Sequence, residues 1–252
     1  SFIINVSSIC TEIINDNNTC LINRINAFNP TSKEQNDDDD GIICNSSYSN
    51  CIISCSSTLS CSDNIYGQRI NIKCPLNGNQ CIINCIGSRS CRNTQIITNN
   101  STQTIINIYG NNAGRDLIIY SSNYLQINVN GESADFVQSK IYTNQYQSSL
   151  SSSIDINCEN GEICTENEIF GQNITDSINF LCSGYNADCS NTNIWCPMQS
   201  SSSSSSNCNI DCSFCRNMNV YTLNGLSSIN WKCDNHKDSC SYSNLYCGQN
   251  MD

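Results

Sequence analysis

Cysteine spacing constrains the fold of this chain more than any other feature of its sequence. One group of four cysteines is repeated with the same spacing thirty residues further along the chain. The first group is Cys44, Cys51, Cys55 and Cys61, and the second is Cys74, Cys81, Cys85 and Cys91. Two later groups also share one spacing: Cys182, Cys189 and Cys196, then Cys233, Cys240 and Cys247. Self-similarity at a period of about 20 to 50 residues is typical of repeat architectures. The chain is therefore predicted to use one structural unit many times.

The segments between the cysteines alternate apolar and polar residues. Ile70-Asn71-Ile72-Lys73-Cys74 and Ile154-Asp155-Ile156-Asn157-Cys158 are examples of this period-two pattern, which indicates β-strand. No stretch has a convincing 3.6-residue apolar period. Short strands at this repeat length form either antiparallel hairpins or a parallel solenoid. The residues at each repeated position all face inward, which favours coils stacked in register. We predict an all-β, right-handed parallel β-helix of about nine coils, forming a single domain over residues 1–252.

Each predicted coil has a first cysteine, a short polar corner and a second cysteine. Between residues 100 and 150 the cysteines disappear, but the apolar pattern continues, with Gly110 and Gly131 expected at the first-cysteine position. Asn93, Asn191 and Asn217 all lie two residues after a second cysteine. Asn tolerates left-handed backbone, and equivalent Asn side chains stack in ladders. We therefore expect these three residues at equivalent corners.

The repeat resembles the cysteine-rich parallel β-helix repeats of secreted and surface proteins of protists. The residues that carry the resemblance are Ile83 to Cys91, Cys74-Pro75, and Cys182-Ser183-Gly184 through Cys189. Some proteins of this type are components of filaments, including those on flagellar hairs. The resemblance therefore implies a structural role, although a fold alone does not establish a function.

The cysteine positions predict ten disulfides. First and second cysteines are present together or missing together, which predicts seven bridges across one corner: Cys10–Cys20, Cys55–Cys61, Cys85–Cys91, Cys158–Cys164, Cys182–Cys189, Cys212–Cys215 and Cys233–Cys240. Three more are expected at the opposite corner: Cys44–Cys51, Cys74–Cys81 and Cys196–Cys208. Cys247 is left over, either unpaired or bonded to another subunit. Zinc is the competing use, but one Cys-x-x-Cys and a lone His236 are weak evidence for it. We therefore expect no metal and no cofactor. A redox-active Cys212–Cys215 pair is a further alternative.

Two insertions interrupt the repeat, at residues 29–41 and 197–207. The first contains Asp37 to Asp40, which lack the alternating ligand spacing of an EF-hand and are interpreted as a solvated loop and not as a Ca²⁺ site. The second contains a run of serines. Asn-x-Ser/Thr sequons that predict N-glycans occur at Asn5, Asn17, Asn45, Asn99 and Asn173.

Composition excludes several classes of function. The net charge is −11, which disfavours binding to a phosphate backbone. Twenty-one cysteines indicate an oxidising compartment, so we expect a secreted or cell-surface protein. No apolar run approaches the ~20 residues of a membrane span. Lys140 and Glu168 are opposite charges expected on adjacent coils, and a surface ion pair is the simpler interpretation of them. With a single His and no set of carboxylates expected on neighbouring outward positions of stacked coils, we expect no enzyme activity.

The two ends of the predicted solenoid suggest self-assembly. The pattern predicts a strand at Phe2 to Val6, with no capping segment before it, and another strand at Leu245 to Cys247 near the other end. Open ends leave backbone donors and acceptors unpaired. We therefore expect a structural subunit of an extracellular glycoprotein filament, with other copies of itself as partners in head-to-tail stacking. The alternatives are a secreted glycan-binding or adhesion module and a polysaccharide-degrading β-helix enzyme.

Overall fold

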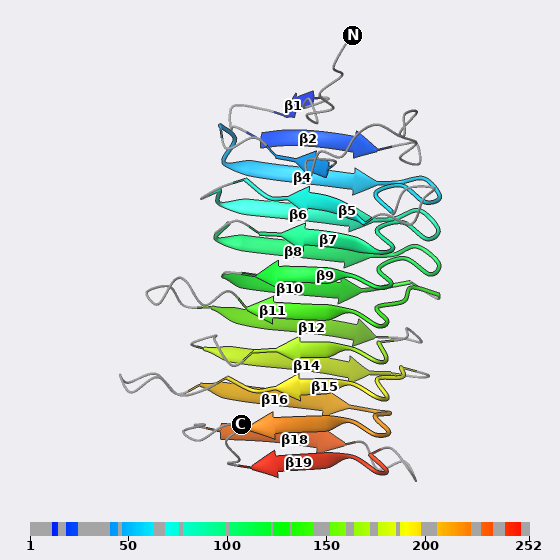
Figure 1. The fold of residues 1–252 in the computed structure, drawn as a ribbon, viewed down its shortest axis with the longest axis vertical. Helices are drawn as coiled ribbons and strands as arrows, with labels where there is room; N and C mark the ends of the chain where they lie inside the picture. Colours follow the sequence, from blue (N-terminus) through cyan, green and yellow to red (C-terminus); the bar gives the residue numbers. More distant parts are fainter. Residues whose placement is uncertain are drawn as a thin grey trace.

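The computed structural model shows a parallel β-solenoid (Figure 1). It describes residues 12–14, 19–24, 41–44, 47–62, 69–75, 78–98, 101–121, 123–131, 133–143, 152–159, 164–171, 176–184, 187–197, 206–222, 228–233 and 240–247, and every structural statement below concerns these residues. The predicted class, an all-β fold of parallel strands in stacked coils, is confirmed.

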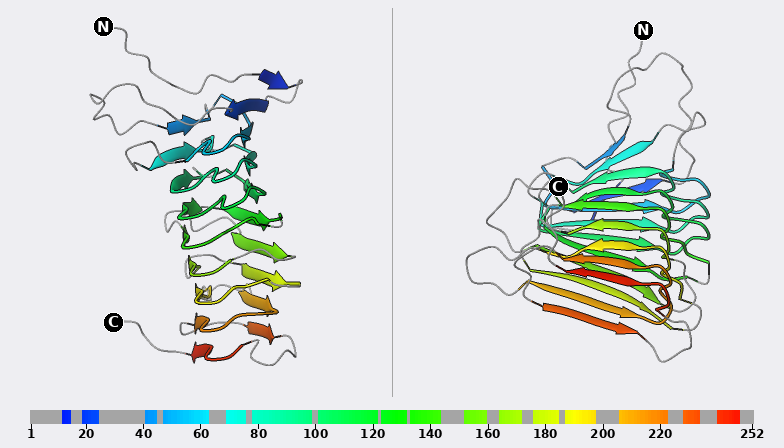
Figure 2. Two further views of the ribbon diagram at one scale, coloured as in Figure 1. Left: turned by 90° about the vertical axis from the view of Figure 1, so that its right-hand side faces the viewer. Right: turned by 60° about the horizontal axis from the view of Figure 1, so that its bottom comes forward.

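Two sheets run the length of the molecule, and the chain alternates between them (Figures 1 and 2). The first sheet has ten strands: β1 (Glu12–Ile14), β2 (Thr19–Arg24), β4 (Asn50–Cys55), β6 (Gln80–Cys85), β8 (Gln103–Ile108), β10 (Tyr124–Val129), β12 (Ser153–Glu159), β14 (Ser177–Ser183), β16 (Asn207–Cys212) and β18 (Ser228–Cys233). The second has nine: β3 (Gly41–Ile43), β5 (Ile70–Lys73), β7 (Thr94–Ile97), β9 (Ile118–Ser121), β11 (Lys140–Thr143), β13 (Glu168–Phe170), β15 (Asn193–Trp195), β17 (Asn219–Thr222) and β19 (Asn244–Cys247).

Equivalent residues of successive coils lie side by side. From β2 onward all neighbouring strands are parallel, and Cys51 pairs with Cys81 as Cys55 pairs with Cys85. Each vertical row of equivalent residues is called a column below. Burial alternates along β4, β6, β8 and β10 because successive side chains point to opposite faces of a strand. The inward columns form one core, with Ile53, Ile83 and Ile106 fully buried.

The cysteine-free coils show that the predicted alignment was wrong by two residues. Ile108 and Val129 pair in the column of Cys85, where Gly110 and Gly131 had been expected. A shift of two residues keeps every side chain on the same face, so the apolar pattern could not detect the error. Ile108 fills the space that a corner disulfide occupies elsewhere. A Cβ on Gly114, whose φ is +74°, would lie 2.5 Å from Cδ1 of Ile108.

One corner column adopts left-handed backbone in coil after coil. Its members have φ between +51° and +60°: Asn93, Asp116, Gln138, Glu166, Asn191, Asn217 and Tyr242. The expectation that Asn93, Asn191 and Asn217 occupy equivalent corners is confirmed, and Asn217 donates to Asn191 at 3.2 Å. Other residue types fill the coils between Asn93 and Asn191, so the amide ladder at this corner is interrupted.

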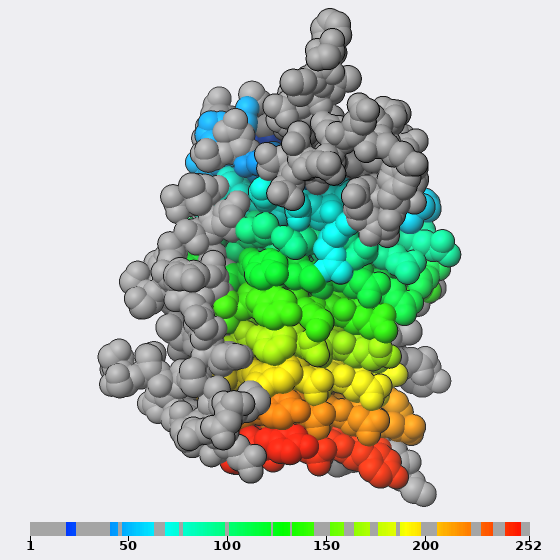
Figure 3. Space-filling view, viewed as in Figure 1, coloured from blue at the N-terminus to red at the C-terminus, as the bar shows by residue number. Residues whose placement is uncertain are grey.

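The N-terminal end differs from the prediction of an uncapped sheet. β1 lies antiparallel against β2 and covers the N-terminal edge of the ten-stranded sheet. Phe2 to Val6, which had been expected to form that edge, lie outside the described residues. The edge of the nine-stranded sheet at this end is β3. At the opposite end β18 and β19 form the last described coil, and β19 is seen in red in Figure 3.

Candidate functional site

Corner disulfides clip most of the described coils. Eight bonds join two described cysteines, and all eight are among the ten predicted pairs: Cys44–Cys51, Cys55–Cys61, Cys74–Cys81, Cys85–Cys91, Cys158–Cys164, Cys182–Cys189, Cys196–Cys208 and Cys233–Cys240. Each joins residues 6 to 12 positions apart. Disulfides in this number indicate an oxidising compartment.

The predicted Cys212–Cys215 disulfide is not formed in the structure. The corner between these cysteines has only Ser213 and Phe214, whereas the other corner bridges of this class span 6 or 7 positions. In this shortened corner the sulfur of Cys215 lies beside Cys240 of the next coil, at 3.6 Å. Cys247 is exposed and outside any disulfide of this chain, so whether it stays unpaired or bonds to another subunit remains a prediction.

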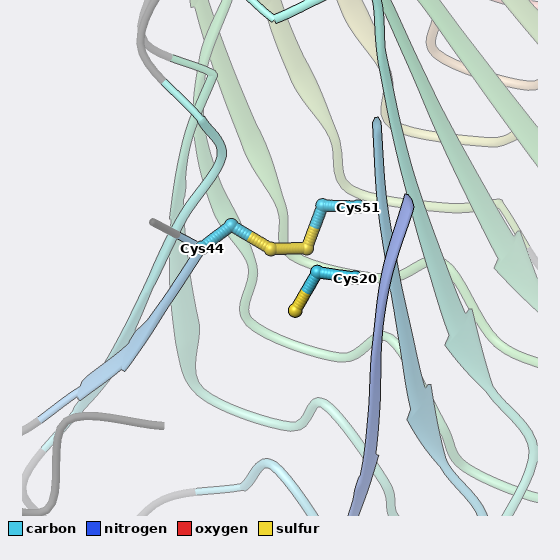
Figure 4. Close-up of side chains that lie close together, drawn as sticks. All are labelled: Cys20, Cys44 and Cys51. Atoms are coloured by element: carbon cyan, nitrogen blue, oxygen red, sulfur yellow. A yellow bond between two sulfur atoms is a disulfide. The ribbon is translucent and has the colours of Figure 1, made fainter. Parts of the chain in front are cut away.

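Cys20 occupies a different column from the one predicted. It pairs with Cys51, so it belongs with the cysteines that open a strand and not with the second cysteines of a corner. Cys20 is disulfide-bonded, and Cys10, its predicted partner, lies outside the described residues. The sulfurs of Cys20, Cys44 and Cys51 lie within 4.8 Å of one another (Figure 4). Metal ligation requires thiolates, and all three sulfurs are in disulfides, so they do not offer metal ligands in this state.

The predicted glycosylation sites Asn5, Asn17, Asn45, Asn99 and Asn173 all lie outside the described residues, as do His236, residues 29–40 and residues 198–205. The glycan predictions therefore stay predictions.

The outward faces of both sheets carry ladders of side-chain amides. On the ten-stranded sheet, Asn107 donates to Asn84, Asn128 to Asn107 and Asn157 to Asn128, at 2.9 to 3.1 Å. On the nine-stranded sheet, a shorter ladder joins three residues in the same way: Asn193, Asn219 and Asn244. The interior amides, Asn107, Asn128 and Asn219, both donate and accept along the axis of the solenoid. These hydrogen bonds connect successive coils outside the core.

The outward carboxylates are partnered on adjacent coils. Lys140 and Glu168 form the predicted ion pair at 2.5 Å, and Lys232 binds Asp211 at 3.0 Å. Asp155 accepts from Tyr124 at 2.5 Å and from Asn179 at 2.6 Å. Burial, and then the hydrogen bond to Asp155, raise the pKa of Tyr124 to about 12. Each of these carboxylates is therefore occupied by a hydrogen bond or an ion pair, and no two of them form a free pair at these positions.

An aromatic ladder on the nine-stranded sheet was missed by the sequence analysis. Six rings stack over successive coils, with centroids 4.4 to 5.4 Å apart and planes within 20° of parallel: Tyr120, Tyr142, Phe170, Trp195, Tyr221 and Tyr246. The sequence does contain a signal for this ladder, because each ring lies two residues after the same outward position of its coil. That position is occupied in turn by Ile118, Lys140, Glu168, Asn193, Asn219 and Asn244. The inner rings cover one another's faces and present edges outward. They are therefore poorly placed to stack on a sugar ring.

The last described coil exposes positions that are buried elsewhere. Leu245 is 45% exposed, whereas Val220 and Ile194 in the same column are fully buried. Ile229 and Trp231 are only partly buried and pack against the end of the core. Cys247 and Tyr246 extend this coil outward, with Tyr246 41% exposed. We call Ile229, Trp231 and Leu245 the terminal apolar surface.

Comparison with known proteins does not assign a family. No protein-family model, curated protein or solved structure matches this chain. None of the described segments is a helix with the length and apolarity needed to cross a bilayer.

Proposed function

We propose that this chain is a structural subunit of an extracellular glycoprotein filament, in which copies stack head to tail through the ends of their solenoids. The proposal includes secretion, N-glycans at the predicted sequons, and no enzyme activity. The observation that carries it is the exposure of core positions on the last described coil. The paired outward carboxylates support a structural role over a catalytic one.

The terminal apolar surface fits a second copy of this chain. Among the described strands, β18 and β19 each have a neighbour on one side only, and such edges accept further strands. β3 is the corresponding edge at the other end, and β1 offers an antiparallel edge beside it. Contact between two different ends of identical subunits is heterologous, and it extends into a filament when the rotation does not close.

Cys247 supplies a means of fastening this contact. Cys247 pairs with Thr222, in the same column as Cys196. Cys196 itself is disulfide-bonded to Cys208, at the start of the next strand. Attack of the Cys247 thiolate on a disulfide of the docked copy would form one S–S bond and break another. One cysteine of the docked copy would leave as a thiol, so no external oxidant is required.

Substitution at the terminal apolar surface tests the proposal. Leu245→Asp places a charge at the joint, and Ile86→Asp is a matched control because Ile86 is 46% exposed at a corner away from the end. We expect negative-stain images and sedimentation to show filaments for the native chain and for I86D, and monomers for L245D. Disulfide mapping checks that both variants fold. Native protein that stays monomeric at high concentration, or L245D that assembles normally, contradicts the proposal.

A glycan-binding module is the second candidate. The observation in its favour is a shallow hollow on the outer face of β14, β16 and β18, lined by Asn179, Asn209 and Asn230 with the Asp211–Lys232 pair beside it. Amides and a charged pair are suited to hydroxyl groups. Binding of neutral polysaccharides that is lost in Asn209→Ala and retained in L245D would favour this function over the filament.

A further inference from the structure

A buried thiol touches a disulfide of the adjacent coil near the C-terminal end of the solenoid. Cys215 is fully buried and is not in a disulfide. Its Sγ lies 3.6 Å from Sγ of Cys240, which is bonded to Cys233. No sulfur of this contact belongs to the proposed joint residue Cys247.

The register of the coils creates this contact. Cys212 pairs with Cys233 in the sheet, and Cys215 lies at the same corner one coil before Cys240. In the earlier neighbouring coils with this corner pair, the bonds Cys158–Cys164 and Cys182–Cys189 are both closed. At this corner of those two coils, one closed disulfide therefore faces another. At the shortened corner of Ser213 and Phe214, the Cys215 thiol instead faces the Cys233–Cys240 disulfide.

We propose that Cys215 is the attacking thiol of an intramolecular exchange with the Cys233–Cys240 disulfide. The Cys215 thiolate attacks Sγ of Cys240, the Cys215–Cys240 bond forms, and the Cys233–Cys240 bond breaks. Cys233 leaves as a thiolate and takes up the proton that Cys215 released. The number of disulfides is unchanged, so the step needs neither an oxidant nor a reductant. The spacing of adjacent strands, about 4.8 Å, lies within the range of Cα separations that a disulfide spans.

The exchange changes both what is bonded and what is accessible. The new bond joins residues 25 positions apart and fastens two successive coils, whereas the eight disulfides whose two cysteines are both described join residues no more than 12 apart. The thiol moves from fully buried Cys215 to Cys233, which is exposed on the last described coil. Cys233 would then react with disulfides from solution, including a small disulfide such as cystine or one on a second chain. This inference does not rest on the proposed filament.

Native alkylation followed by peptide mapping tests the exchange. A Cys247→Ser background removes the exposed competing thiol, and Cys215→Ser/Cys247→Ser is the matched variant. The folded proteins are treated with iodoacetamide over a pH series, then unfolded, digested without reduction and mapped. We expect Cys233 to be labelled together with a Cys215–Cys240 linked peptide in C247S. Labelling should increase several-fold as the pH is raised, because exchange proceeds through the thiolate. In the double variant, Cys240 should be bonded only to Cys233, and Cys233 should therefore be unlabelled.

Two results would overturn the inference. One is a native Cys212–Cys215 bond, which would remove the attacking thiol. The other is a C247S protein in which Cys215 stays reduced and Cys233 stays unlabelled even at alkaline pH. Serine differs from cysteine by one atom, and the disulfide map of the remaining bridges verifies that each variant has folded.

Discussion

At the scale of single residues, this solenoid places several outward carboxylates beside a hydrogen-bond donor or cation of a neighbouring coil. Asp155, Glu168 and Asp211 each meet a donor or cation one coil away. Asp135 is different because it is only 8% exposed, at a corner of the solenoid. Burial raises the pKa of its carboxyl, and the nearby Arg115 lowers it by a smaller amount. The raised pKa means that the folded state favours the protonated form.

Replacement of Asp135 with Asn should therefore stabilise the protein at neutral pH. A group whose folded pKa exceeds its unfolded pKa contributes stability below the unfolded pKa and loses it as pH rises through the folded value. We expect D135N to have a higher midpoint of thermal unfolding than the native chain at neutral pH. The difference should vanish well below the ordinary carboxyl pKa of about 4. An equal advantage at both pH values would attribute the effect to packing and not to charge.

At the scale of elements, the two sheets are held in register by ladders on their outer faces as well as by the core. The aromatic ladder spans β9 to β19, and the amide ladder on the ten-stranded sheet spans β6 to β12. Each ladder repeats one interaction at every coil, so a slip of one strand would break contacts on both of its sides. The ladders therefore specify register in addition to stabilising it.

Removing one ring from the aromatic ladder tests this interpretation. Phe170→Ala separates Tyr142 from Trp195 and removes two stacked pairs, each worth about 0.5 to 1.5 kcal/mol beyond burial. We expect F170A to lose at least about 1 to 3 kcal/mol of unfolding free energy in denaturant titration, because the loss of buried ring surface adds to the loss of stacking. Phe170→Tyr keeps the ring and should change stability by less than about 0.5 kcal/mol. If the two variants lost the same amount, ring stacking would not be the cause.

At the scale of the whole molecule, the described disulfides are distributed unevenly along the solenoid. Bridges clip the coils from β3 to β7 and from β12 to β19, while the strands β8 to β11 have none. Closing a loop of this size contributes about 2 kcal/mol by restricting the unfolded chain. In a solenoid each unit contacts only its neighbours, so local stability adds along the axis.

Reduction should therefore loosen the molecule unevenly. We expect hydrogen exchange after mild reduction to increase most in β4, β6, β14 and β16, and least in β8 and β10, whose core is aliphatic. The unreduced protein under the same conditions is the reference. A uniform loss of protection over all strands would show that the coils unfold as one cooperative unit, contrary to this prediction.

The repeat spacing of the cysteines was enough to predict the class of fold and most of the described disulfides. Cys55, Cys61, Cys85 and Cys91 keep both their spacing and their apolar neighbours, so local pattern and global stacking point to the same pairs. The same spacing placed Cys247 correctly in the column of Cys196. The left-handed corner at Asn93, Asn191 and Asn217 was also predictable, because few residue types tolerate that backbone.

The sequence alone could not determine relations between coils of unequal length. A period-two pattern is unchanged by a shift of two residues, so the alignment of Ile108 and Val129 became known only from strand pairing. The β1 cap, the aromatic ladder and the contact of Cys215 with Cys240 depend on which residues become neighbours across coils. Local sequence determined that these segments form strands and corners. Three-dimensional stacking decided which side chains meet, because loop lengths differ from coil to coil and only the packed core sets their register.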